Sequence, residues 1–376
     1  MKKSAAKMKL FREVMVALVV CGIADILGGS FLGIFEDYLI AVPGILLMIP
    51  PTMGLRGNVY GALAARFSTS LHLGTATEES VKEEFFTTMG EILFLSFFIP
   101  IFALIASKIM GFRIANYFLL TFVMVFTAFF SGAILTALTV FIAKFSHKCG
   151  WDPDNVTAPF VTTAGDIITI PTIFLGVFLA LMTPLIAQLI VILISLIILI
   201  KWFRGRAKFN RIAIMLVCAM ISGIGGVILE TSVFPSISGT AVVFLIPVFM
   251  GEAGNVSSVF SSRMGTDYHL GILNFKKILR DALTLLGSVV LVFLLIAILS
   301  LPISSVIALR YSPSILAYVV FVGFMVSLVG ILFGPLIAIS SIKLGANPDD
   351  VSIPIITSMC DALSSLVLYL TLSFVI

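Results

Sequence analysis

The chain has few charged residues. Only 11% of its 376 residues are charged, whereas 60% are hydrophobic, and its mean hydropathy is +1.19. A soluble domain typically has about 25% charged residues, and this chain has too few to cover a water-soluble fold with a polar shell. The shortage excludes a soluble globular protein. It predicts an all-α polytopic membrane protein whose surroundings are the lipid bilayer.

Cysteine and histidine are also scarce. The four cysteines lie singly along the chain, and there are only three histidines. This pattern excludes a zinc knuckle or a CxxC redox centre, and no His/Cys cluster indicates a soft metal. The net charge of +4 is small, and membrane topology accounts for it better than a nucleic-acid partner does.

The apolar residues are grouped into long runs. Because a membrane span needs about 20 mainly apolar residues, the runs predict about eleven transmembrane helices, at residues 13–34, 39–66, 88–109, 113–146, 158–181, 184–202, 211–230, 236–263, 278–300, 312–343 and 351–376. An odd number of spans places the two termini on opposite sides of the membrane. On this assignment 20 of the 23 Lys and Arg residues lie on one side, which predicts a cytoplasmic N-terminus and an external C-terminus.

One sequence feature occurs twice. The segment "PTMGLRGNVYGALAARFSTSLHLGT" at 51–75 corresponds to "PVFMGEAGNVSSVFSSRMGTDYHLG" at 247–271. At a constant offset of 197 positions, the residues in register are Pro50/Pro247, Gly54/Gly251, Gly57/Gly254, Asn58/Asn255, Arg66/Arg263, His72/His269 and Gly74/Gly271.

A second pair of segments extends the duplication. "DPDNVTAPFVTTAGDIIT" at 152–169 matches "NPDDVSIPIITSMCDALS" at 347–364 with an offset of 195, which aligns Asp166 with Asp361. We therefore predict a five-helix repeat at 1–183, a linker transmembrane helix and basic loop at 184–210, and a second five-helix repeat at 211–376. Two five-helix repeats joined directly would have opposite orientations, because five is an odd number of crossings. The linker helix adds one crossing, so both repeats should have the same orientation, related by a pseudo-twofold axis along the membrane normal.

The repeated Gly/Pro segments are predicted to interrupt their helices. Backbone groups that lack hydrogen bonds are tolerated at membrane depth only where they are buried or line a watery cavity. Interrupted segments at corresponding positions of two repeats indicate a transport site. Asn58 and Asn255 could supply amide oxygens to an ion there, although packing through small residues is the alternative for the glycines.

Asp166 and Asp361 are the strongest candidates for ion binding. Each follows a proline that could start a helix by seven residues, which places it roughly 10 Å into the bilayer. Acidic residues at membrane depth usually mark ion or proton pathways. Two close carboxylates repel unless a cation lies between them. Mg2+ prefers oxygen ligands and is often held by one or two carboxylates with several waters.

The two repeats are not identical. Glu252 occupies the position of Leu55, and Asp25 lies within the first span, where its approximate counterpart is Ala219. We add Glu252 to the predicted metal-binding residues Asp166, Asp361, Asn58 and Asn255. The asymmetry could also provide a site for a coupling ion such as Na+ or H+.

The two motifs resemble the MgtE superfamily, and most closely its duplicated form in the eukaryotic solute carrier family 41. The resemblance implies magnesium transport through a pore between two five-helix units, with one pore aspartate from each, here Asp166 and Asp361. We expect no counterpart of the cytosolic regulatory domains of bacterial MgtE in this sequence, since only about a dozen residues precede the first predicted span.

These observations predict a non-enzymatic transporter of Mg2+ in the plasma membrane that functions as a monomeric pseudo-dimer. Two alternatives stay open at this point. One is Na+- or H+-coupled Mg2+ exchange. The more remote one is an intramembrane aspartyl hydrolase, in which the two aspartates would form a catalytic dyad.

Overall fold

The protein is helical throughout the part of the chain that the computed structural model describes, residues 2–205, 208–233, 235, 245–306, 314–345 and 348–371. The elements are α1 (Lys2–Ile34), α2 (Glu36–Ala41), α3 (Ile45–Leu73), α4 (Glu78–Met110), α5 (Tyr117–Lys148), α6 (Pro153–Met182), α7 (Leu185–Gly205), α8 (Phe209–Ile228), the π-helical turn η1 (Leu229–Val233), α10 (Ile246–His269), α11 (Phe275–Val306), α12 (Ser314–Lys343) and α13 (Pro348–Thr371).

Each of the eleven predicted spans overlaps one long helix, and the second span, 39–66, also includes the end of α2 and the turn before α3. Nine of these helices, taken over the described residues, are long and apolar enough to cross a membrane. The other two, α3 and α10, contain the Gly-Asn segments and are buried along most of their length. A helix that is enclosed by other helices does not face lipid, so it can carry more polar residues than its neighbours. Parts of the predicted spans 236–263, 312–343 and 351–376 lie outside the described residues.

The same pairs of helices pack together in the two predicted repeats. In the first repeat α4 packs on α5, α5 on α6 and α6 on α3; in the second, α11 packs on α12, α12 on α13 and α13 on α10. The first helix of each repeat crosses to the other repeat, because α1 packs on α10 and α11 while α8 packs on α3 and α4. Helices α3 and α13 also pack together, as do α10 and α6. The interface therefore runs through the middle of the molecule.

The predicted interruption of the first Gly/Pro segment is wrong. Helix α3 is continuous through Pro50 and Pro51. Pro51 has no N–H to bond to the carbonyl of Leu47, and Gly226 on α8 packs directly against that carbonyl, where a Cβ would collide with it. Helix α10 begins at Ile246, with Pro247 in its first turn, where a missing N–H costs no helical bond.

The carboxylate of Glu230, in η1 just after α8, caps the start of α3. Glu230 accepts hydrogen bonds from the backbone N–H groups of Gly44, at 2.9 Å, and Leu47, at 3.0 Å. Helix N-termini have unpaired N–H groups and favour negative charge. Gly44 adopts a left-handed conformation, with φ of 93°, which suits glycine at this turn. Glu230 is therefore a structural cap at the start of α3.

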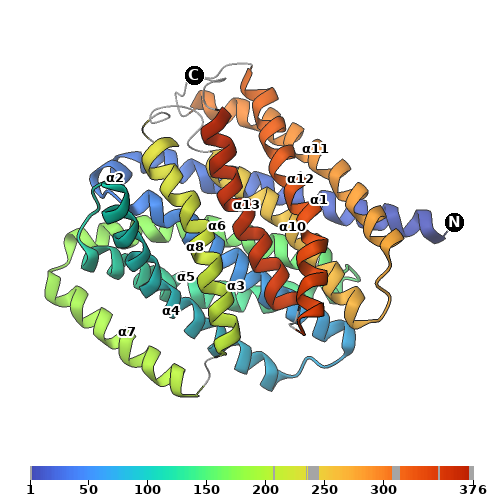
Figure 1. Ribbon diagram of the computed structural model, residues 1–376, viewed down its shortest axis with the longest axis horizontal. Coiled ribbons are helices and arrows are strands. Elements are labelled where there is room, and N and C mark those ends of the chain that lie inside the picture. The colour runs from blue at the N-terminus through green and yellow to red at the C-terminus, as the bar shows by residue number, and fades with distance from the viewer. Residues whose placement is uncertain are drawn as a thin grey trace.

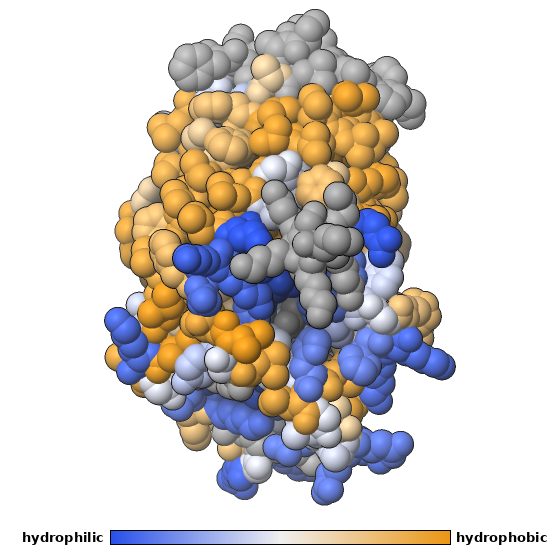
Figure 2. All heavy atoms as spheres, turned by 90° about the vertical axis from the view of Figure 1, so that its right-hand side faces the viewer, coloured by the Kyte–Doolittle hydropathy of each residue, from blue (hydrophilic) through white to orange (hydrophobic). Residues whose placement is uncertain are grey.

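Helix α7, the predicted linker, lies at the edge of the molecule and packs on α4 and α5 (Figure 1). Many of its apolar side chains are exposed, as expected of a helix that faces lipid. On the face at the right of Figure 1, apolar side chains form a broad upper band, whereas hydrophilic ones gather in the middle and lower parts (Figure 2). This distribution fits a protein with a lipid-facing belt and a polar end.

Candidate functional site

A small cavity lies where α3, α6, α10 and α13 meet. Its volume is about 30 Å³, which is room for about two or three water molecules. Both predicted pore aspartates line it. The described residues that line it are Met53, Gly54, Thr162, Asp166, Met250, Gly251, Gly254, Asn255, Thr357 and Asp361. Because the motif pairs Met53/Met250, Gly54/Gly251, Thr162/Thr357 and Asp166/Asp361 all contribute, the cavity is built largely from corresponding residues of the two halves.

The aspartates lie deeper in their helices than predicted. Helix α6 begins at Pro153 and α13 at Pro348, whereas Pro159 and Pro354 lie inside these helices. Asp166 and Asp361 are therefore roughly 20 Å along the helix from its start. Each is 5% exposed, and the two are close enough for their charges to interact.

Asp361 lies between a serine and a glycine. Ser222 on α8 donates a hydrogen bond to Asp361 Oδ2 at 2.8 Å. Gly54 on α3 faces both groups, and a Cβ at this position would collide with the Asp361 carboxylate and with the Ser222 hydroxyl. The glycine thus lets the backbone of α3 approach the carboxylate closely.

Asp166 has a different neighbour at the corresponding place. A Cβ on Gly251 would lie 2.5 Å from Asp25 Oδ2 and 3.3 Å from Asp166 Oδ2. Asp25 therefore occupies, beside Asp166 and Gly251, the position that Ser222 occupies beside Asp361 and Gly54. The sequence comparison assigned Ala219 as the counterpart of Asp25, and the structure corrects this to Ser222. The reason is that the offset between the two first helices is 197 at the cavity, as it is in the Gly-Asn segments.

Glu252 lies near Asp25 and is not among the residues that line the cavity. Its side chain is fully buried on α10, and a Cβ on Gly22 of α1 would lie 3.2 Å from Glu252 Oε1. The charges of Glu252 and Asp25 interact. In the part of the chain that the structure describes, no three His, Cys, Asp or Glu side chains are arranged closely enough to hold a metal ion by themselves.

The two asparagines connect the halves by matching hydrogen bonds. Asn58 on α3 donates to Ser358 on α13 at 2.6 Å, and its amide oxygen accepts from Thr357. Asn255 on α10 donates to Thr163 on α6 at 3.1 Å, and its amide oxygen accepts from Thr162. Both asparagines are almost completely buried.

These bonds define what each asparagine contributes. Asn255 lines the cavity. The hydrogen bond from Thr162 uses one of the two lone pairs of its amide oxygen and leaves the other available. Asn58 forms the equivalent cross-half bond but is absent from the lining. Sequence reasoning missed the threonine partners, although "VTT" at 161–163 and "ITS" at 356–358 stand at the constant offset of 195.

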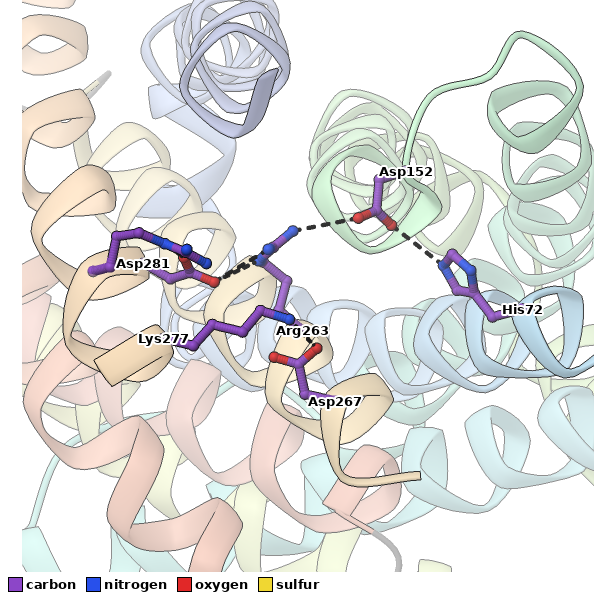
Figure 3. Close-up of polar contacts among 7 residues, drawn as sticks. His72, Asp152, Arg263, Asp267, Lys277 and Asp281 are labelled. Atoms are coloured by element: carbon purple, nitrogen blue, oxygen red, sulfur yellow. Dashed lines mark hydrogen bonds and ion pairs between the residues drawn. The ribbon is translucent and has the colours of Figure 1, made fainter. Parts of the chain in front are cut away.

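A network of ion pairs lies at the polar end of the same helices (Figure 3). Asp152, just before α6, contacts His72 at the end of α3 and Arg263 on α10, both at 3.3 Å. Arg263 also pairs with Asp281 on α11 at 3.1 Å. The carboxylate of Asp152 thus joins helices of both halves rather than serving only as a helix cap.

Part of this network is duplicated. Arg66 pairs with Glu84 at 3.1 Å, and these two residues correspond to Arg263 and Asp281 at the offset of 197. Arg211 at the start of α8 makes two further contacts with Glu84, both at 2.9 Å. In each half, an arginine that follows the Gly-Asn segment is held by an acidic residue of the next helix. The predicted cytoplasmic ends of the central helices are therefore fastened to their neighbours.

The fold and the site together define a multi-pass membrane protein with an acidic cavity enclosed between its helices. A family model described as "Divalent cation transporter", named MgtE, matches residues 49–177 and again residues 246–371. The chain belongs to this family. The description of this family is that of a transporter and not of the hydrolase that an aspartate pair alone left open.

Two relatives belong to solute carrier family 41. Member 2 of Gallus gallus is 28% identical over 292 residues, which cover 72% of this chain and 50% of the relative. Member 3 of Mus musculus is 26% identical over 279 residues, which cover 69% of this chain and 57% of the relative. The chain spans about half the length of the curated relatives it matches. Among solved structures, a MOP superfamily transporter from Pyrococcus furiosus aligns over 98% of this chain and 95% of its own, with a TM-score of 0.35 and 13% identity.

Proposed function

We propose that the protein carries Mg2+ across the plasma membrane through the cavity between Asp166 and Asp361. The observation that carries the proposal is that one cavity, at the interface of the two halves, is lined by both carboxylates. Membership in a family of divalent cation transporters supports it. The repeated helix packing and the twofold family match support two like-oriented repeats around this cavity.

The charge of the cavity favours a divalent cation. Among the described residues, its lining contains two acidic side chains and no lysine, arginine or histidine. In a medium of low dielectric constant, two neighbouring carboxylates stay ionised together only when positive charge lies between them. One Mg2+ balances both charges.

The polar groups that line the cavity beside the aspartates offer oxygen ligands. Thr162 and Thr357 contribute hydroxyl groups to the lining, and Asn255 contributes an amide oxygen. Mg2+ prefers such ligands and usually keeps several of its waters. We assign direct or water-mediated contact with the ion to Asp166, Asp361 and Asn255. Asn58 instead positions Thr357, which lines the cavity, by accepting its hydrogen bond.

Transport requires the cavity to widen. In the described conformation it has room for about two or three waters, too little for an ion that keeps an octahedral shell of water. The network around Asp152 lies farther along the same helices, toward the predicted cytoplasmic side. We infer that passage involves separation of α3 and α10 from α6 and α13, together with rearrangement of these ion pairs.

The test is Mg2+ uptake into proteoliposomes. Asp166→Asn and Asp361→Asn keep the size of the side chain and remove the charge, so uptake should fall to the level of empty vesicles in either variant. Asp37→Asn, the same change at an exposed position on α2, should leave uptake unchanged. Size-exclusion profiles in detergent report whether each variant is folded. Normal uptake by both cavity variants would refute the proposed function.

Coupled exchange is the second candidate function. It is favoured by the two additional buried acids, Asp25 and Glu252, which lie on one side of the cavity only. Repeating the uptake assay with and without a gradient of Na+ or pH separates an exchanger from a channel.

A further inference from the structure

A second cavity lies between the linker helix α7 and helices α4 and α5, at the edge of the molecule (Figure 1). Its volume is about 250 Å³, compared with about 30 Å³ for the cavity around the aspartates. Phe86 on α4, Phe129 on α5 and Ile198 on α7 line it and are between 37% and 50% exposed. The cavity is therefore open at the surface that these helices present to the bilayer.

The corresponding face of the second half is uncovered. Gly90 on α4 matches Gly287 on α11 at the offset of 197. A Cβ on Gly90 would collide with the indole ring of Trp202 on α7, whereas a Cβ on Gly287 would meet no described atom within 4 Å. Leu283 and Val290, one turn to either side of Gly287, are exposed. Among the described residues, only the first half thus has a helix over this face, and the cavity lies where that cover is incomplete.

Trp202 places an unpaired donor at the cavity. Its side chain is 7% exposed, and its indole N–H has no acceptor among the described residues. The ring and Gly90, on which it packs, both belong to the lining. A buried donor without an acceptor is costly. Tryptophan is typical of the membrane interface, where lipid carbonyl groups meet the acyl chains.

Two basic side chains stand at the same end of α7. Lys201 lines the cavity, and Arg204 follows three residues later, so both lie on the same face of the helix. Both are exposed, and neither forms an ion pair within the described part of the chain. The nearby acids of α4, Glu83 and Glu84, pair instead with Lys208. Two positive charges are therefore available beside an apolar cavity.

We propose that this cavity binds one anionic phospholipid of the cytoplasmic leaflet. One acyl chain occupies the apolar part between α4, α5 and α7. An ester carbonyl accepts the hydrogen bond of the Trp202 indole, and the phosphate lies against Lys201 and Arg204. Because the matching face of α11 is uncovered, one such lipid binds per molecule. The inference goes beyond Mg2+ transport and does not depend on it.

The chemistry of the cavity favours this ligand over others. A free phosphate group would leave the apolar part of the cavity unfilled, and a phospholipid without net charge would leave the two cations unbalanced. The predicted topology places Lys201 and Arg204 on the cytoplasmic side, where membranes carry their anionic lipids. The open side of the cavity lets an acyl chain enter directly from the bilayer.

The first test compares two phospholipids with the same acyl chains. Native mass spectrometry of the full chain in detergent should show one bound palmitoyl-oleoyl phosphatidylglycerol, retained about tenfold or more over palmitoyl-oleoyl phosphatidylcholine. Lys201→Gln with Arg204→Gln should abolish this preference. Lys108→Gln with Arg113→Gln removes two exposed charges at the opposite, predicted external end of the helices. That control should keep the preference.

A second pair of variants tests the apolar part of the site. Ile198→Trp fills the cavity from α7, whereas Ile197→Trp makes the same change at an exposed neighbour that is not among the lining residues. Ile198→Trp should lower the retention of both lipids, and Ile197→Trp should not. Ile198→Phe serves if Ile198→Trp does not fold. Trp202→Phe removes the N–H and keeps an aromatic ring, so it should also lower the retention of both lipids.

A preference for phosphatidylglycerol that persists in the folded Lys201→Gln, Arg204→Gln variant would overturn the inference. Unchanged retention in both Ile198→Trp and Trp202→Phe would do the same, because the lipid would then lie elsewhere. Glycerol phosphate that displaces the lipid would assign the site to a soluble phosphate, and dimers that form when lipid is removed would assign the face to a second copy. None of these results affects the proposed function, which fails only if Asp166→Asn and Asp361→Asn both transport normally.

Discussion

Gly54 and Gly251 stand where the central helices touch the carboxylates of the cavity. At both positions an added Cβ would meet a carboxylate oxygen, from Asp361 in one half and from Asp25 in the other. These glycines are therefore a condition for the geometry of the site and not only small residues that ease helix packing.

Gly54→Ala should weaken Mg2+ transport without preventing folding. The new methyl group must displace the Asp361 carboxylate or the Ser222 hydroxyl. Overpacking of this kind costs about 1–3 kcal/mol, which corresponds to an increase of roughly tenfold in apparent KM if the loss falls on ion binding. Initial rates of uptake at several Mg2+ concentrations measure this change.

Gly33→Ala is the matched control, because Gly33 lies on α1 with no neighbouring atom within 4 Å of an added Cβ. It should transport like the wild type. A Gly54→Ala protein with unchanged KM and rate would show that the close approach to Asp361 has no part in ion binding.

For single residues, the sequence predicted those that occur at corresponding positions of the two halves and did not predict the role of those that occur in one half only. Asp166, Asp361 and Asn255 were found because their motifs recur, and all three line the cavity. The role of Ser222 was not predicted, because a serine within a span carries no distinctive signal. Which side chains face each other across helices depends on packing, which a one-dimensional comparison does not contain.

At the scale of the helix, α3 depends on a cap from the other half. Glu230 accepts hydrogen bonds from the backbone N–H groups of Gly44 and Leu47 at the start of α3, and Gly44 has a left-handed conformation. The prolines of the second turn were expected to interrupt this helix. They are accommodated because Gly226 lets α8 pack against the carbonyl that Pro51 leaves unbonded. A contact between segments about 180 positions apart could not be read from either segment alone.

Glu230→Gln should lower the stability of the protein by about 1–2 kcal/mol, because it removes the negative charge and one of the two acceptor oxygens at the start of α3. Thermal unfolding in detergent should show a reduced Tm. Glu79→Gln, at an exposed position in the first turn of α4, should change Tm little. An unchanged Tm for Glu230→Gln would mean that water or another group caps α3 equally well.

On the scale of the whole molecule, the uneven distribution of Lys and Arg predicts the orientation in the membrane. Cys149, just after α5, is exposed, whereas Cys21, Cys218 and Cys360 are buried. A membrane-impermeant maleimide should therefore label the wild type at Cys149 alone, and only from the cytoplasmic side of sealed vesicles of known orientation. Cys149→Ser should abolish the labelling. Modification from the external side would reverse the predicted topology.

The crossing of the first helices has a consequence for how such a chain could have arisen. α1 covers α10 and α11, and α8 covers α3 and α4, so a lone ancestral unit would have left a long apolar groove open to lipid or to a second copy. Once both copies were on one chain, each could diverge, and the acids at Asp25 and Glu252 show how far one side has moved from the other.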